Sequence, residues 1–162
     1  MATPIDVADT RSPLDDMVCF ALYAAARATN RRYLALLAPW QLTYPQYLVL
    51  VLLWSRQSLT VGDIAANLLL DTGTTSPLIR RLEQRGLVRR DRTSSDERIV
   101  TVSLTEDGQA LRDTLAHIPG CIADATKLDE ATGRGALTVL HEVTQNLDHP
   151  DERTHDGLHL HR

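Results

Sequence analysis

The apolar positions in the first third of the chain predict two helices. A helical pattern runs through residues 14–38 without glycine or proline and ends at Pro39. Thr43 and Gln46 then form a capping box ahead of a second helix, which extends to about Ser55. Because nearly every residue of this second helix is apolar, we expect it to be buried.

The following segment predicts a helix-turn-helix. Thr60 caps a helix of about two turns, and the residues LDTG form the turn after it. The second helix begins within residues 72–75, because Pro77 is tolerated only in a first helical turn, and Gly86 ends it. The inner face of this helix is formed by Leu78, Ile79 and Leu82.

The period of the pattern changes after this helix. Residues 87–90 and 99–104 predict two strands joined by a polar, arginine-bearing segment, which together form a hairpin wing. Thr105 caps a long helix that the Pro-Gly pair at 119–120 should kink or break. A last helix is expected over residues 129–147.

This order predicts a mainly α fold, in which a winged helix-turn-helix with a small β-hairpin wing is flanked by N- and C-terminal dimerisation helices. The end helices carry more apolar surface than a domain of this size needs, which favours a homodimer. We expect a flexible N-terminus at 1–13, a single domain at 14–147 and a flexible tail at 148–162. Within the domain, the winged helix-turn-helix covers about 59–104, and the dimerisation helices cover about 14–38 and 106–147.

Charge is distributed unevenly along the chain. The net charge of the 162 residues is −4, but residues 80–98 hold seven arginines against four acids and are therefore locally basic. A basic patch on a helix-turn-helix and wing is the electrostatic signature of DNA binding. The alternative is a solvated surface whose arginines are held in local ion pairs.

The helix-turn-helix geometry predicts which side chains reach DNA. The start of the second helix enters the major groove, where threonine and serine hydroxyls and arginine side chains meet phosphates and base edges. At the wing tip Arg98 reaches an adjacent minor groove and Asp96 braces its guanidinium. The candidates on the helix are Thr72, Thr74, Thr75, Ser76, Arg80 and Arg81.

Several segments resemble one known family. The stretches LTVGDIA, LDTGTTSPLIRRLEQRGLVRR, DERIVTVSLTEDG and LTYPQYLVLVLLW resemble the MarR family of winged-helix repressors. Within that family, MVCFALYAAAR, RRYLALL and TYPQYL resemble the organic hydroperoxide sensors, the OhrR branch. The similarity covers about residues 14–147. It implies a repressor that releases its operator when a cysteine on the N-terminal helix, here Cys19, is oxidised.

The spacing of Cys19 and Tyr33 agrees with a site shared between two subunits. Fourteen residues of helix bring Tyr33 to within about 40° of the face of Cys19, but about 21 Å along the axis. The two side chains therefore cannot touch within one chain, whereas Cys19 can meet Tyr33 of a partner in a two-fold dimer. The resemblance implies that the hydroxyls of Tyr33 and Tyr44 donate to the sulfur across the dimer, and that Cys121 of the partner subunit is the resolving thiol.

The sequence leaves alternatives open. Cys19 lies in an apolar run and can be a small, inert core residue, the tyrosines can be ordinary packing residues, and Cys121 can be inert while a small thiol caps Cys19. A MarR-type repressor released by a small aromatic ligand is the first rival function. A thiol peroxidase is the second, although no βαβ pattern or Cys-x-x-Cys supports it.

The remaining expectations concern cofactors and location. The six histidines show no metal-ligand spacing, so we expect no metal. We also expect no cofactor and no enzymatic activity, because the sensing cysteine reacts once per cycle. No apolar run approaches the roughly 18 residues of a membrane span, and the N-terminus shows no signal-peptide pattern. Two distant cysteines fit a reducing cytoplasm. The expected partners are a palindromic double-stranded DNA operator, a second copy of the chain, and organic hydroperoxides as inducers.

Overall fold

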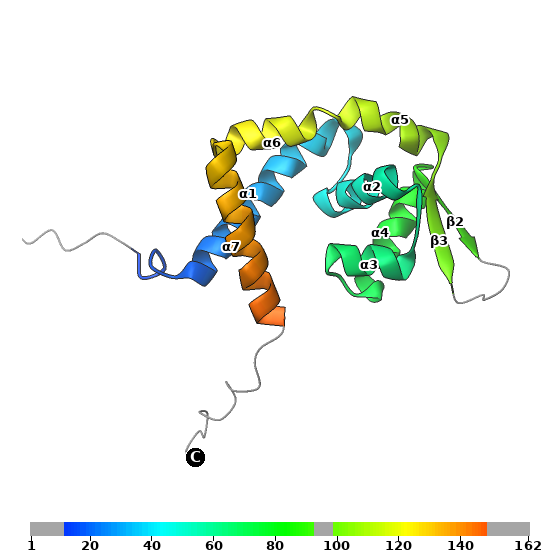
Figure 1. Cartoon of the computed structure of the whole chain (residues 1–162). Helices are drawn as coiled ribbons and strands as arrows, with labels where there is room; N and C mark the ends of the chain where they lie inside the picture. The colour runs from blue at the N-terminus through cyan, green and yellow to red at the C-terminus, as the bar shows by residue number, and fades with distance from the viewer. Residues whose placement is uncertain (1–11, 93–98, 149–162) are drawn as a thin grey trace, which may run out of the picture. The chain divides into compact units, whose positions relative to one another are not determined.

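The computed structural model describes residues 12–92 and 99–148, and Figure 1 shows the arrangement of their helices and strands. The chain divides into two compact units, and the division falls between Ile118 and Pro119. The elements in chain order are α1 (Val18–Leu37), the short 3₁₀ helix η1 (Ala38–Trp40), α2 (Tyr44–Arg56), β1 (Ser58–Thr60), α3 (Val61–Leu68), α4 (Thr72–Gln84), β2 (Val88–Arg92), β3 (Val100–Leu104), α5 (Glu106–Leu115), α6 (Ile118–Thr126) and α7 (Glu130–Asp148).

The core of the first unit is built around α2, as its apolar sequence predicts. Every element from the end of α1 to Ile118 contributes apolar side chains to this core, which excludes water by packing helices against both the helix-turn-helix and the sheet. The prediction that α2 is buried holds only in part, because five of its 13 residues are buried and Val51 is 38% exposed. The fully buried members include Leu37, Val49, Leu50, Leu53, Ile64, Ile79, Leu82, Val102 and Ile118.

Side-chain caps begin the helices at the positions that the sequence indicates. The capping box of α2 is present, and the backbone N–H of Thr43 donates to Gln46 Oε1 at 3.0 Å. Thr60 accepts a hydrogen bond from the backbone N–H of Asp63 at the start of α3, and Thr105 caps α5. Such caps satisfy backbone donors that the first turn leaves without a helical partner.

The start of α4 corrects one premise of the sequence analysis. The helix begins at Thr72, within the expected range, because Asp71 accepts hydrogen bonds from the backbone N–H of Thr74 at 2.7 Å and from its hydroxyl at 2.8 Å. Pro77 therefore lies in the second turn, not the first. Its ring nitrogen cannot donate to the carbonyl of Gly73, but Gly73 is exposed and water can serve that carbonyl. The predicted end is confirmed, since Gly86 follows the helix with a φ of 70°.

The predicted wing is present, and it belongs to a sheet of three strands. β2 and β3 pair antiparallel, with Arg90 opposite Val102. β1 pairs with the other edge of β3, so the order is β1-β3-β2. β1 was not predicted, because three residues between two helices carry no alternating pattern of their own.

The expected break of the long helix after Thr105 is confirmed. α5 ends at Leu115 and α6 begins at Ile118, so that Pro119 lies in the first turn of α6, where its missing N–H costs little.

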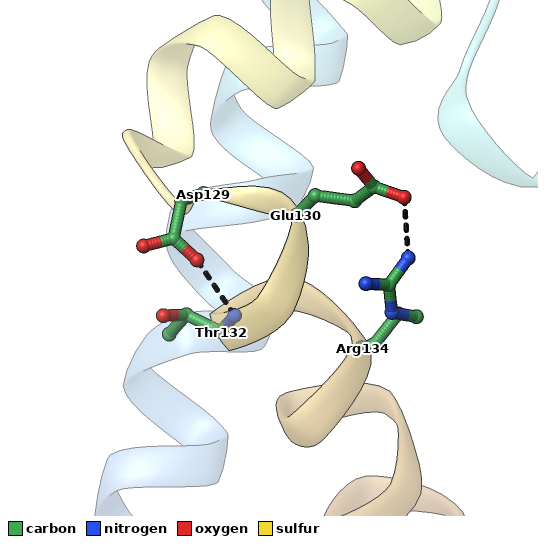
Figure 2. Close-up of polar contacts among 4 residues, drawn as sticks. All are labelled: Asp129, Glu130, Thr132 and Arg134. Carbon is green, nitrogen blue, oxygen red and sulfur yellow. Dashed lines mark hydrogen bonds and ion pairs between the residues drawn. The ribbon is translucent and has the colours of Figure 1, made fainter.

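In the second unit, α7 is stabilised locally at its N-terminus (Figure 2). Asp129 Oδ1 accepts a hydrogen bond from the backbone N–H of Thr132 at 2.8 Å, and Glu130 forms an ion pair with Arg134 one turn later. Hydrogen bonds from Thr132 lower the pKa of the Asp129 carboxyl, as is usual for a helix cap. No residue of α7 is buried within the chain.

By length and composition, no single helix among residues 12–92 and 99–148 qualifies as a membrane span. One bent pair, Val18–Trp40 with Tyr44–Arg56 at 73°, meets those two criteria when its members are taken together.

Candidate DNA interface and thiol site

The predicted DNA-reading side chains lie on α4, the second helix of the helix-turn-helix. Thr72 and Ser76 are exposed in its first turns, and Arg80 and Arg81 are exposed farther along. Thr74 is also exposed, but both its backbone N–H and its hydroxyl donate to Asp71. The structure therefore brings five of the six helix candidates to the surface, while their contacts with DNA remain a prediction.

Thr75 does not fit the predicted role. Its side chain is fully buried, and its hydroxyl donates to the backbone carbonyl of Asp71 at 2.9 Å. The rotation of α4 against the core directs Thr75 inward together with Ile79 and Leu82. Thr75 is thus a packing residue, and we remove it from the set of DNA contacts.

The base of the wing is tied to α4 by an ion pair. Arg90 on β2 donates to Glu83 Oε2 at 2.8 Å through Nε and lies 2.6 Å from the same oxygen through its Nη2. Arg89 lies 3.4 Å from Asp91 and also donates to Ser103. Arg89 and Arg90 are therefore held in local ion pairs, as the alternative to DNA binding predicts. Asp96 and Arg98 lie outside the described residues.

A cavity of about 500 Å³ separates the start of α4 from the wing. Thr72 and Ser76 line it from α4, Arg90 and Val100 line it from the hairpin, and Thr60 also lines it. The hollow thus places the exposed face of α4 and the described part of the wing on two sides of one groove.

The two thiols lie in different units of the chain. Cys19 is the second residue of α1 and is exposed, and Cys121 is partly buried on α6. Neither forms a disulfide within the chain. The exposure of Cys19 argues against the interpretation that it is an inert core residue of the single chain.

The two tyrosines predicted to serve Cys19 lie together. The rings of Tyr33 and Tyr44 stack with centroids 3.9 Å apart, and the ring of Tyr47 lies 5.8 Å from that of Tyr33. Burial, then the neighbouring Tyr44 and Tyr47 and a hydrogen bond with Tyr44, raise the pKa of Tyr33 to about 12. At neutral pH, well below this value, the Tyr33 hydroxyl carries its proton and can donate a hydrogen bond.

Two residues near the site were not identified from the sequence. Tyr47 follows Tyr44 by three residues, so a helical wheel of α2 would have placed both on one face. Burial raises the pKa of Tyr47 as well. Asp71 was assigned only to the turn, although an aspartate directly before a helix is a strong capping signal.

Within the described ranges, no group of three or more histidine, cysteine, aspartate and glutamate side chains is arranged to hold a metal ion.

Comparisons with known proteins identify relatives of this chain. The MarR family profile matches residues 42–100. The organic hydroperoxide resistance transcriptional regulator of Bacillus subtilis (strain 168) is 46% identical over 134 residues, which cover 83% of this chain and 91% of that protein. Among solved structures, reduced AbfR bound to DNA is 30% identical with a TM-score of 0.71, over 84% of this chain and 95% of that one. The disulfide-formed state of AbfR, a protein of Staphylococcus epidermidis, is 32% identical with a TM-score of 0.58, over 84% and 90%.

Proposed function

Because this chain belongs to the MarR family of DNA-binding transcriptional regulators, we propose that it is a repressor whose release from DNA is controlled by oxidation of Cys19. The family assignment also answers one alternative, since its members are regulators and this chain is not an enzyme. The similarity to an organic hydroperoxide regulator supports this class of oxidant as the inducer.

The repressor acts as a homodimer on a palindromic operator. The apolar side chains that α1 and α7 leave exposed support this assembly, because a monomer gains nothing from displaying them to water. Each subunit then presents one α4 to the major groove, and the dimer axis fixes the spacing of the two half-sites. The exposed apolar residues on these helices are Val18, Tyr23, Leu34, Leu137, Val139, Leu140 and Leu147.

The observation that carries the redox assignment is the exposed thiol of Cys19 on α1, the helix that also carries Tyr33, whose ring stacks on Tyr44 of α2. Within one chain the thiol and the pair lie at opposite ends of α1. In a dimer whose α1 helices run past each other, the two hydroxyls of one subunit reach the sulfur of the other. A thiolate that accepts hydrogen bonds from two protonated hydroxyls is stabilised for reaction.

The chemistry proceeds in two steps. The Cys19 thiolate attacks the terminal oxygen of an organic hydroperoxide, the O–O bond breaks, and the alkoxide leaves as an alcohol after protonation. Cys19 becomes a sulfenic acid. The thiolate of Cys121 from the partner subunit then attacks the sulfenic sulfur, which forms a disulfide and releases water. A cellular thiol reductant restores both thiols, which fits a protein that acts in the cytoplasm.

The test compares wild type with Cys19→Ser on a duplex that wild type enriches from random DNA. Both proteins should bind this duplex when reduced, and cumene hydroperoxide should release only wild type. The Cys121→Ser variant is the matched thiol control, because it should retain sulfenic acid formation at Cys19. Release of Cys19→Ser by the hydroperoxide would refute the proposal, and hydroperoxide-independent release by a small aromatic acid would favour the rival ligand-controlled repressor.

A further inference from the structure

The C-terminal end of α4 is held by Arg85, which is not among the predicted DNA contacts. Arg85 is the C-cap residue of α4, and its backbone N–H donates to the carbonyl of Arg81. Gly86, directly after it, adopts a φ of 70° and donates to the carbonyl of Glu83. The backbone of Arg85 is thus fixed to the last turn of the recognition helix.

The guanidinium of Arg85 reaches a distant segment, residues 38–43 between α1 and α2, which we call the elbow. Its Nη1 donates to the carbonyl of Gln41 at 2.9 Å, and its Nη2 donates to the carbonyl of Trp40 at 2.5 Å. Two parallel bonds from one planar guanidinium fix direction as well as distance. Arginine is therefore suited to hold these two backbone groups in one orientation relative to α4.

The elbow presents these carbonyls because its backbone turns sharply. Gln41 has a φ of 52°, a left-handed conformation that ends the 3₁₀ helix, and its N–H donates to the carbonyl of Ala38. The last carbonyls of a helical turn have no intrahelical partner and carry partial negative charge. Arg85 satisfies two of them with a charged donor.

The elbow is also the segment that joins the two stacked tyrosines. Tyr33 lies on the last turns of α1 and Tyr44 is the first residue of α2, so their stack spans the elbow. The stack therefore offers a route by which oxidation of a partner's Cys19 would act on the elbow. On its other side, the last turn of α4 is joined to the wing by the Glu83–Arg90 ion pair.

We propose that Arg85 is a positioning residue that couples the elbow to the recognition helix, so that oxidation at α1 moves α4 through this two-bond clamp. The inference rests on the proposed redox function and extends it from the thiol to the DNA-reading helix. It differs from a phosphate-binding role for Arg85, which would alter DNA affinity equally in both redox states. A clamp instead alters the ratio of the two affinities.

The experiment measures the dissociation constant for the enriched duplex by fluorescence anisotropy, before and after stoichiometric cumene hydroperoxide. The quantity of interest is the oxidised-to-reduced ratio of dissociation constants in full-length wild type, Arg85→Lys and Arg85→Ala. Lysine keeps the charge but not the planar fork, so we expect the ratio to fall by about five-fold in Arg85→Lys and further in Arg85→Ala. Arg112→Lys and Arg112→Ala, at an exposed arginine of α5, are the matched controls and should keep the wild-type ratio.

A second readout separates loss of coupling from loss of folding. Trp40 lies in the elbow, so its fluorescence, recorded in a Trp54→Phe background, should still change on oxidation in Arg85→Lys while the DNA affinity no longer follows. A wild-type ratio in both Arg85 variants, or an equal loss of affinity in both redox states, would overturn the coupling role. A wild-type protein that ignores the hydroperoxide would instead overturn the proposed function itself, and the inference with it.

Discussion

Tyr33 and Tyr44 stack across the junction of α1 and α2, with ring centroids 3.9 Å apart and ring planes inclined by 21°. The contact joins the helix that carries Cys19 to the central helix of the core. It also places the Tyr33 hydroxyl beside Tyr44 in partly buried surroundings, which disfavours a negative charge on Tyr33. The protonation of Tyr33 is therefore linked to the stability of the fold.

This linkage predicts an alkaline loss of stability. Burial, reinforced by Tyr44 and Tyr47, raises the pKa of Tyr33 to about 12 from the usual 10.0. Between these values the unfolded chain has released a proton that the folded chain retains, so the free energy of unfolding should fall as pH rises from 10 towards 12. In Tyr33→Phe this slope should be weaker. Urea unfolding at several alkaline pH values measures it, and identical slopes in both proteins would contradict the assignment.

Asp71 predicts a pH dependence at the opposite end of the scale. Hydrogen bonds from the hydroxyl and the backbone N–H of Thr74 lower the pKa of its carboxyl from the usual 3.8. A group with a lowered folded pKa contributes its stability in full above the unfolded pKa and loses it as pH falls through the folded pKa. Wild type should therefore lose stability below about pH 4 as this cap is protonated.

Two substitutions at Asp71 separate the charge from the cap. Asn also accepts the hydrogen bond of a helix cap but does not titrate. Asp71→Asn should thus be less stable than wild type at neutral pH and converge with it in acid, whereas Asp71→Ala should be destabilised at every pH. Urea midpoints across the acid range decide this, and an Asn variant that keeps the full wild-type slope would exclude Asp71 as its source.

Local signals in the sequence predicted most element boundaries. The capping box at Thr43, the cap at Thr60 and the break before Pro119 depend only on neighbouring residues, so each could be predicted without knowledge of the fold. The sequence could not predict β1, whose strand conformation depends on pairing with β3. The clamp of Arg85 joins residues that are 44 and 45 positions apart, and no periodicity reports such a contact.

For the candidate site residues, too, local signals were predictive and long-range contacts were not. Thr72 and Ser76 were expected at the surface because the helix start was predicted well. Thr75 was misassigned, since one residue on α4 changes the direction of a side chain by about 100° and only the packing against the core fixes that angle. Helical period therefore predicted α4 itself, while tertiary contacts decided which of its threonines are exposed.

The close contact between Gly108 of α5 and Leu87, directly before the wing, predicts that a side chain at position 108 destabilises the protein. A Cβ at this position would lie 2.0 Å from the backbone carbonyl oxygen of Leu87, which already accepts a hydrogen bond from Thr105. The carbonyl of Gly108 also accepts the indole N–H of Trp54 at 2.9 Å. Neither backbone can move without breaking these bonds, so Gly108→Ala should destabilise the protein by about 3 kcal/mol.

A second glycine is the control for this prediction. A Cβ at Gly62 meets only the Thr60 hydroxyl, at an ordinary 3.7 Å. Gly62→Ala should therefore be neutral or stabilising by up to about 1 kcal/mol, because alanine favours the helix. Thermal and urea unfolding of both variants give the comparison, and equal stabilities would show that the α5 contact relaxes freely.

The last prediction concerns Cys121. A sulfenic acid at Cys19 is a small chemical change, whereas a disulfide requires the two Cα atoms to lie within about 7 Å. Cys121 follows the Pro-Gly pair at the start of α6, in the second compact unit, so a bond to Cys19 of a partner would constrain that unit directly.

After stoichiometric hydroperoxide, non-reducing gels should show a covalent dimer in wild type and none in Cys121→Ser. The variant should still form a Cys19 sulfenic acid that dimedone traps, and it should over-oxidise faster because no thiol resolves it. Cys19→Ser should show neither product. A covalent dimer that persists in Cys121→Ser, or wild type that leaves DNA while running as a monomer on the gel, would assign the switch to Cys19 alone.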